Sequence, residues 1–186
     1  NRCQEIVDFS DLNKLSGDAE REWLMIRATA CIRLQDESCA LRDYNTIVSR
    51  TPNFVPAING LASIALQNED LSKATSLINK AMSLEPENAI TWRLKGQLAY
   101  RQGDTDAATA HLQKALTFNR DDPIALRNLV DLYLEAKDYD TAKLFVDEII
   151  QDTPNDPLAI LLNSWLQSRD NQQAIDNEKL KELNDF

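Results

Sequence analysis

The stretch 101-RQGDTDAATAHLQKAL-116 contains a Gly-Asp turn, a small residue four positions later (Ala108), and an apolar face beyond it. Nearly the same arrangement returns at one fixed spacing in the sequence, the one that separates Asp36 from Asp70, and we call this spacing the repeat interval. At this interval stand Asp36, Asp70, Asp104 and Asp138, and likewise Ala40, Ala74, Ala108 and Ala142. It also relates Pro52, Pro86 and Pro154, with Arg120 where the third proline would fall. A fixed period of this size indicates stacked structural repeats.

The composition predicts an all-helical protein with a buried core. Apolar residues make up 43% of the 186 residues, and only four glycines and six prolines interrupt a chain rich in helix-forming residues. The formal net charge of -10 opposes broad contact with phosphate backbones, so we expect no nucleic-acid partner. No apolar run approaches the roughly 20 residues that span a bilayer, so we expect no membrane insertion.

The block 89–122 is predicted to be a helical hairpin. Apolar or small residues at Trp92, Gly96 and Ala99 follow helical spacing, Gly103 and Asp104 supply a turn, and a second apolar stripe follows. The blocks 21–54, 55–88 and 123–156 have the same layout. One hairpin cannot cover its own apolar face, so we expect each copy to pack on the next. The tightest contacts should involve small or modest side chains, at Ala28, Ala62, Gly96 and Val130 in the first helices.

This pattern resembles the tetratricopeptide repeat (TPR) family, whose signature is W-x2-L-G-x2-Y, then A-x3-F-x2-A and a late proline. The signature appears here as Trp92, Gly96, Ala108, Leu112 and Ala115, and as Leu129, Tyr133, Ala142, Val146, Ile149 and Pro154. The departures are Lys95 for the leucine, Ala99 for the tyrosine, and Arg120 for the proline. The resemblance covers about 21–156. It implies an all-α fold, an α-solenoid of stacked antiparallel hairpins wound as a right-handed superhelix.

The two ends of the chain depart from the repeat. We expect residues 1–20 to form an N-terminal helical cap or linker, with a break at Gly17 before a helix from about Ala19. Residues 157–186 are predicted to form a partial fifth repeat and a C-terminal capping helix. The sequence begins at Asn1 without an initiator Met, so we expect a processed product or an excised fragment of a larger protein.

Catalytic and metal-binding chemistry is missing from the sequence. The single histidine, His111, is interpreted as a solvated residue on an outer helix face, and one histidine with scattered cysteines makes no metal set. We find no glycine-rich phosphate loop and no nucleophile with a histidine motif near it. We therefore expect no enzyme activity, no cofactor and no bound metal.

The cysteines leave two interpretations open. Cys31 and Cys39 lie on opposite sides of one predicted turn, where a disulfide is plausible, and a bridge there would imply an oxidising, extracytoplasmic compartment such as a periplasm. Alternatively, Cys31 is a small buried residue, Cys39 is incidental, and the protein is cytoplasmic. Cys3 is left over in either case.

The resemblance implies that the first helix of each hairpin lines a concave groove. The expected lining carries five arginines (33, 93, 101, 127, 169) against three acidic residues (22, 131, 135), although the whole chain is acidic. Guanidinium groups pair well with carboxylates, so we expect a peptide partner with acidic and apolar side chains. The residues expected to contact it are Asn59, Leu66, Arg93, Gln97, Tyr100, Arg101, Arg127, Asp131, Leu134 and Trp165.

The sequence therefore favours a non-enzymatic scaffold for protein–protein interaction, in a narrower form an accessory factor in secretion or pilus assembly. One alternative is a structural module that self-associates into a homo-oligomer through the terminal faces around Trp165 and Phe186, or around Phe9. Another is an adaptor domain excised from a larger protein.

Overall fold

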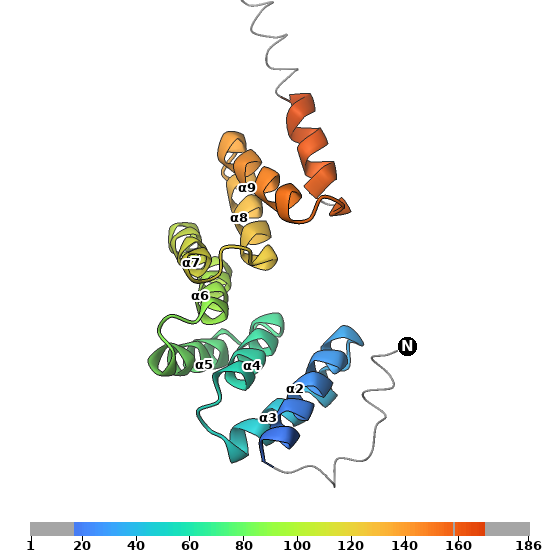
Figure 1. The fold of residues 1–186 in the computed structure, drawn as a ribbon. Coiled ribbons are helices and arrows are strands. Elements are labelled where there is room, and N and C mark those ends of the chain that lie inside the picture. The colour runs from blue at the N-terminus through green and yellow to red at the C-terminus, as the bar shows by residue number, and fades with distance from the viewer. Residues whose placement is uncertain (1–16, 158, 170–186) are drawn as a thin grey trace, which may run out of the picture. The chain divides into compact units, whose positions relative to one another are not determined.

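The computed structural model describes residues 17–157 and 159–169, and all of the regular structure in this range is helical (Figure 1). The predicted all-α fold is confirmed. Its helices form consecutive pairs, each joined by a short turn. They are α2 (Asp18–Arg33), α3 (Glu37–Arg50), α4 (Val55–Gln67), α5 (Leu71–Leu84), α6 (Ala89–Arg101), α7 (Thr105–Phe118), α8 (Pro123–Glu135), α9 (Tyr139–Asp152) and a further helix over residues 159–169.

The aspartates that recur at the repeat interval cap the second helix of each pair. Each accepts a hydrogen bond through its side chain from the backbone N–H three residues later, over distances of 2.9 to 3.1 Å. A cap of this kind satisfies one of the N–H groups that a helix start leaves without a partner. The repeated residue is therefore explained by local helix chemistry. The four caps are Asp36, Asp70, Asp104 and Asp138.

The residue before each capping aspartate ends the first helix in a left-handed conformation. These four residues have φ between 57° and 82°, and only one of them is a glycine. The following N–H closes a hydrogen bond of 2.9 or 3.0 Å back to the carbonyl five residues earlier, which is the Schellman arrangement. The four residues are Gln35, Glu69, Gly103 and Lys137.

The chain divides into two compact units, residues 1–111 and 112–186. In the first unit, α2 packs on α3, α3 on α4, α4 on both α5 and α6, and α5 on α6. The small residues predicted at the helix contacts, Ala28, Ala40, Ala62 and Ala74, are fully buried.

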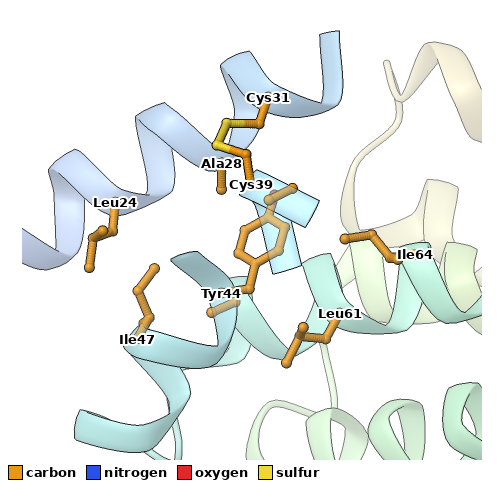
Figure 2. Close-up of a cluster of buried hydrophobic side chains, with 10 residues drawn as sticks. Leu24, Ala28, Cys31, Cys39, Tyr44, Ile47, Leu61 and Ile64 are labelled. Carbon is orange, nitrogen blue, oxygen red and sulfur yellow. A yellow bond between two sulfur atoms is a disulfide. The ribbon is translucent and has the colours of Figure 1, made fainter. Parts of the chain in front are cut away.

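The first pair of helices is held by a disulfide and a buried ion pair. Cys31 of α2 and Cys39 of α3 are joined through sulfurs 1.96 Å apart, as Figure 2 shows beside the Tyr44 ring. One turn from Cys39, Asp43 accepts two hydrogen bonds from Arg27 of α2, of 2.7 and 2.6 Å. This carboxylate is almost wholly buried, so its pairing with Arg27 offsets the cost of removing the charge from water.

Gly60 allows α4 to approach α3 closely. A Cβ atom at this position would lie 2.5 Å from the Tyr44 ring, well inside van der Waals contact. Figure 2 shows that ring with Leu61 and Ile64, two of the α4 residues that share its cluster. A glycine in the interior of α4 is therefore explained by packing between the first and second helix pairs.

In the second unit, α8 packs on α9, and the helix over residues 159–169 packs against both. The shared core contains Leu126 and Val130 of α8, Val146 and Ile149 of α9, and Leu166 of the last helix. The start of a fifth repeat predicted from residue 157 is thus helical and buries one face.

Several expectations fall outside the described residues. These are Cys3, most of the N-terminal cap, and the capping helix expected after residue 169. At the edge of the described part, Gly17 has φ 62° and directly precedes α2, which begins at Asp18. None of the helices described is long and apolar enough to cross a bilayer.

Candidate partner-binding surface

The first helix of the third pair, α6, has a buried side and an exposed side. On α6, Leu94 and Leu98 are buried, whereas Ile90 and Tyr100 remain 45% and 42% exposed. Residues 90, 93, 97 and 100 lie on one side of an α-helix, because each is three or four positions from the next, and residue 101 joins them because it is four positions after residue 97. We call this set, Ile90, Arg93, Gln97, Tyr100 and Arg101, the α6 surface.

The α6 surface combines large apolar groups with cationic ones. Arg101 is exposed and lies 3.6 Å from Glu69, itself largely exposed, which is an ion pair of the weak, solvated kind. Arg93 and Gln97 are partly buried. The predicted contact residues of α6 are therefore brought together with Ile90 on one helix in the first unit.

Two predicted contact residues are buried, so their prediction as lining residues is wrong. Asn59 and Leu66 of α4 are each only 4% exposed. Leu66 packs in a cluster with Leu94 and Leu98 of α6, because neighbouring first helices contact each other side by side. Asn59 lies in the same contact between α4 and α6.

Asn59 belongs to a polar network that fixes the position of α6. Its amide group donates to Asn88 at 3.3 Å and its oxygen accepts from the hydroxyl of Thr91 at 3.1 Å. Asn88 in turn caps α6 by accepting from the N–H of Thr91 at 3.1 Å. A buried side-chain amide with these partners is a structural element of the repeat contact.

A second exposed surface lies on the second unit. We call it the C-terminal surface and define it by Ile124 and Asp131 of α8 and by Leu161 and Trp165 of the last helix. All four are exposed, Leu161 by 66% and Trp165 by 47%. Leu134, which was predicted with them, is partly buried and packs against the core of this unit.

Arg127, predicted to bind a partner, is engaged within the protein. Its guanidinium pairs with Asp156, which also caps the last helix by accepting from the N–H of Ala159 at 2.9 Å. Asp156 was not predicted from the sequence, although it follows the first-helix caps Asn88 and Asp122 at the repeat interval. That spacing was the signal that could have found it.

The charges around Asp131 act on its carboxyl. Partial desolvation and the neighbouring Glu135 raise the pKa of Asp131, while Arg127 opposes the change. At the other end of this surface, the guanidinium of Arg169 lies 3.6 Å from the centre of the Tyr139 ring, and that ring meets Trp165 edge-on at 5.8 Å. Arg127 and Arg169 of the second unit thus both have partners within the chain.

His111 differs from its predicted environment. It was predicted to be a solvated residue on an outer helix face, but it is partly buried, with its ring 5.5 Å from that of Trp92. Burial and the charge of Lys95 lower the pKa of His111, and Asp104 opposes them.

One group of potential metal ligands occurs among the described residues. Cys31, Cys39 and Asp43 are buried, and their ligand atoms lie within 4.8 Å of one another. In the structure the two sulfurs are bonded to each other and both oxygens of Asp43 accept from Arg27. The atoms that could bind a metal ion are therefore engaged in a disulfide and an ion pair in this structure.

Comparison with known families identifies the repeat. Two family models, both described as Tetratricopeptide repeat, match residues 61–127 and 99–165. Together they span residues 61–165, which is more than half of the chain. A search of curated proteins finds no match.

Solved structures agree with the fold. A thermophilic TPR protein from Thermus thermophilus matches with a TM-score of 0.68 and 23% identity, over 79% of this chain and 81% of that one. The pilF protein of Pseudomonas aeruginosa matches with a TM-score of 0.64 and 17% identity, over 88% and 76%. The O-GlcNAc transferase of Thermobaculum terrenum matches with a TM-score of 0.65 and 17% identity, over 74% of this chain but only 27% of the enzyme. These similarities show an α-solenoid of TPR type.

Proposed function

Because the chain belongs to the tetratricopeptide repeat family, whose members are scaffolds for protein–protein interaction, we propose that it is a non-enzymatic scaffold that binds a peptide segment of a partner protein. The binding site in the first unit is the α6 surface. The observation that carries this proposal is the exposure of Ile90 and Tyr100 beside Arg93 and Arg101 on one helix.

The chemistry of the α6 surface favours an acidic and apolar peptide. Tyrosine offers a large contact area at low entropic cost and is enriched among residues that dominate binding energy. Arg101 has only a weak, solvent-exposed partner in Glu69, so a partner carboxylate could replace it at little cost. The overall charge of -10 makes such a cationic surface a local exception.

The test uses two short peptides that share leucine and phenylalanine positions and differ only at central residues, which are glutamate in one and lysine in the other. We expect the glutamate peptide to shift amide resonances of α6 in the full chain. Tyr100→Ala should weaken its binding about fivefold or more, since truncating a central aromatic anchor costs on the order of 1 kcal/mol. Leu144→Ala is the matched control, because Leu144 is 70% exposed on a second helix. Shifts confined to α3 and α5 would refute the proposal.

The disulfide supports a location in an oxidising compartment. A bond between Cys31 and Cys39 persists where thiols are not kept reduced, as in a periplasm or secretory lumen. Thiol counting on denatured protein from the native source should find one free thiol, that of Cys3. Three free thiols would contradict this location.

A role in secretion or pilus assembly is the narrowest form of the proposal. Its support is the likeness in fold to pilF, at 17% identity. Identification of the partner by affinity capture from the native source would test it, and a partner unrelated to either process would contradict it.

A further inference from the structure

We propose that Cys31, Cys39 and Asp43 form a zinc site when the disulfide between the two cysteines is reduced. The first helix pair is then held together in either of two ways, by a disulfide under oxidising conditions and by a bound metal ion under reducing ones. This site lies inside the first helix pair, so it does not depend on which partner the α6 surface binds.

The three side chains converge because of their places on the two helices. Cys31 is in the last turn of α2 and Cys39 is in the first turn of α3. Asp43 follows Cys39 by four positions, so these two lie on the same face of α3. The two sulfurs and a carboxylate oxygen lie within 4.8 Å of one another, and all three residues are exposed by 2% or less. Reduction therefore leaves three potential ligands in one buried place.

The distances between these residues suit a tetrahedral zinc ion. Zinc takes thiolate sulfurs at about 2.3 Å, which places two such sulfurs about 3.8 Å apart. The Cα atoms of Cys31 and Cys39 are 5.8 Å apart, and rotation about each Cα–Cβ bond separates the sulfurs to this extent. Asp43 is held in one orientation by two hydrogen bonds from Arg27, and each of its oxygens keeps a second lone pair. A water molecule that enters with the ion completes the four ligands.

The charges around the site select a divalent cation. Two thiolates and the Asp43 carboxylate carry three negative charges, and Zn²⁺ with the Arg27 guanidinium carries three positive ones, so the buried group is neutral. A neutral sum matters because unbalanced charge is costly to bury. Arg42, which approaches Asp43 at 4.0 Å, is 67% exposed and is screened by solvent. Thiolate ligands favour zinc over magnesium and calcium, which prefer oxygen.

The change from disulfide to metal site is a two-electron reaction. A dithiol reductant gives two electrons and two protons to the disulfide, which becomes two thiols while the reductant forms its own disulfide. Zinc then displaces the two thiol protons, which pass to the buffer. An oxidising disulfide reverses both steps and releases the ion. Gln35 and Asp36, in the turn between the cysteines, are exposed, so local opening of this turn admits the reagents.

Zinc titration of the full chain tests the site, with Cys3→Ser as the parent so that the third thiol cannot contribute. The chain is reduced with a phosphine and titrated without oxygen against a chromophoric chelator. We expect one equivalent of zinc on the reduced chain and none on the oxidised chain. The further change of Cys31→Ser with Cys39→Ser should abolish binding. Zinc bound equally by that variant would place the metal on surface carboxylates and overturn the proposal.

Asp43→Asn distinguishes the three-residue site from a pair of thiols alone. Asparagine keeps an acceptor for Arg27 but loses the negative charge, so the affinity for zinc should fall at least about tenfold. Asp36→Asn is the matched control, because Asp36 caps the same helix, asparagine caps it equally well, and Asp36 does not belong to the ligand group. Equal affinities of these two variants would overturn the assignment of Asp43.

Two measurements on the Cys3→Ser chain keep the test decisive if Asp43→Asn does not fold. In carbon-13 spectra of the aspartate carboxyl groups, zinc should shift the resonance of Asp43 and leave that of Asp36 in place. Reduction should speed hydrogen exchange in α2 and α3, and zinc should slow it again because the metal replaces the lost cross-link. A reduced chain that binds no zinc, or a zinc-bound chain with an unmoved Asp43 resonance, would overturn the proposal.

Discussion

Three of the four residues that end the first helices in a left-handed conformation carry a side chain. Gln35, Glu69 and Lys137 have φ between 57° and 60°, where a Cβ atom approaches the following carbonyl. Gly103 occupies the equivalent place without that strain. The same backbone geometry therefore has a higher conformational free energy in the three repeats with a side chain at this position than in the repeat with Gly103.

Lys137→Gly is expected to stabilise the protein by about 1 kcal/mol, because glycine adopts this conformation without steric penalty. Gly103→Ala should destabilise it by a similar amount. Chemical denaturation measures both changes. Lys137→Ala is the control, since it retains the Cβ atom and should leave the stability within about 0.5 kcal/mol. Equal effects of glycine and alanine at this position would contradict the explanation.

His111 gives the stability a dependence on pH. Its folded-state pKa lies below the ordinary value of 6.5, because burial and Lys95 disfavour the charged ring. Below about pH 6.5 the unfolded state therefore binds more protons than the folded state, and the free energy of unfolding falls as the pH falls. His111→Gln should remove this part of the decrease below about pH 6.5. Chemical denaturation at a series of pH values measures this change. If the free energy of unfolding of the variant falls with pH as steeply as that of the unaltered protein, the assignment to His111 is contradicted.

At the scale of helices, contacts between repeats depend on polar groups as well as on apolar packing. The hydroxyl of Thr91 is fully buried and donates to Asn59 of the preceding repeat. Asn88 links the same two residues while it caps α6. The start of α6 is therefore positioned by side chains from two repeats.

Thr91→Val is expected to destabilise the protein by about 1–2 kcal/mol, because valine keeps the shape but leaves the buried oxygen of Asn59 without its donor. Thr75→Val is the matched control. The hydroxyl of Thr75 bonds only to the carbonyl of Leu71 in its own helix, so its loss should cost about 0.5 kcal/mol or less. A double-mutant cycle with Asn59→Ala checks the coupling, and additive effects would exclude it.

Features that depend on one helix were predicted well from the sequence. The repeat interval located the helix pairs, because caps such as Asp104 and small contact residues such as Ala108 act through near neighbours. Features that depend on the next repeat were predicted poorly. Leu66 is buried by its neighbour α6, and Arg127 is paired with Asp156, the cap of the following helix. Helical position alone identifies a side of one helix, but it does not say what covers that side.

On the scale of the whole molecule, the disulfide between Cys31 and Cys39 lies within one of the two units. It closes a short loop with a Cα–Cα distance of 5.8 Å, and a loop of this length contributes about 2–3 kcal/mol. In repeat proteins stability is nearly a sum of local terms, so the effect of its loss should also be local.

Reduction of the disulfide, or Cys31→Ser with Cys39→Ser, is expected to speed hydrogen exchange in α2 and α3 and to leave exchange in α8 and α9 unchanged. Mass spectrometry of exchanged peptides measures this. Cys3→Ser serves as the control for thiol loss. A uniform increase in exchange along the chain would show that the two units unfold as one.

Because Arg127 of α8 pairs with Asp156, the charge that α8 presents to solvent depends on Asp156, the residue that caps the following helix. Asparagine caps a helix start as well as aspartate does, so Asp156→Asn would retain the cap while releasing a full positive charge toward solvent. Any partner selectivity that α8 contributes can thus be changed by a substitution at Asp156, a residue that need not contact the partner. Changing the order of the repeats would also change this selectivity, even with every contact residue preserved, because each first helix would then precede a different capping residue.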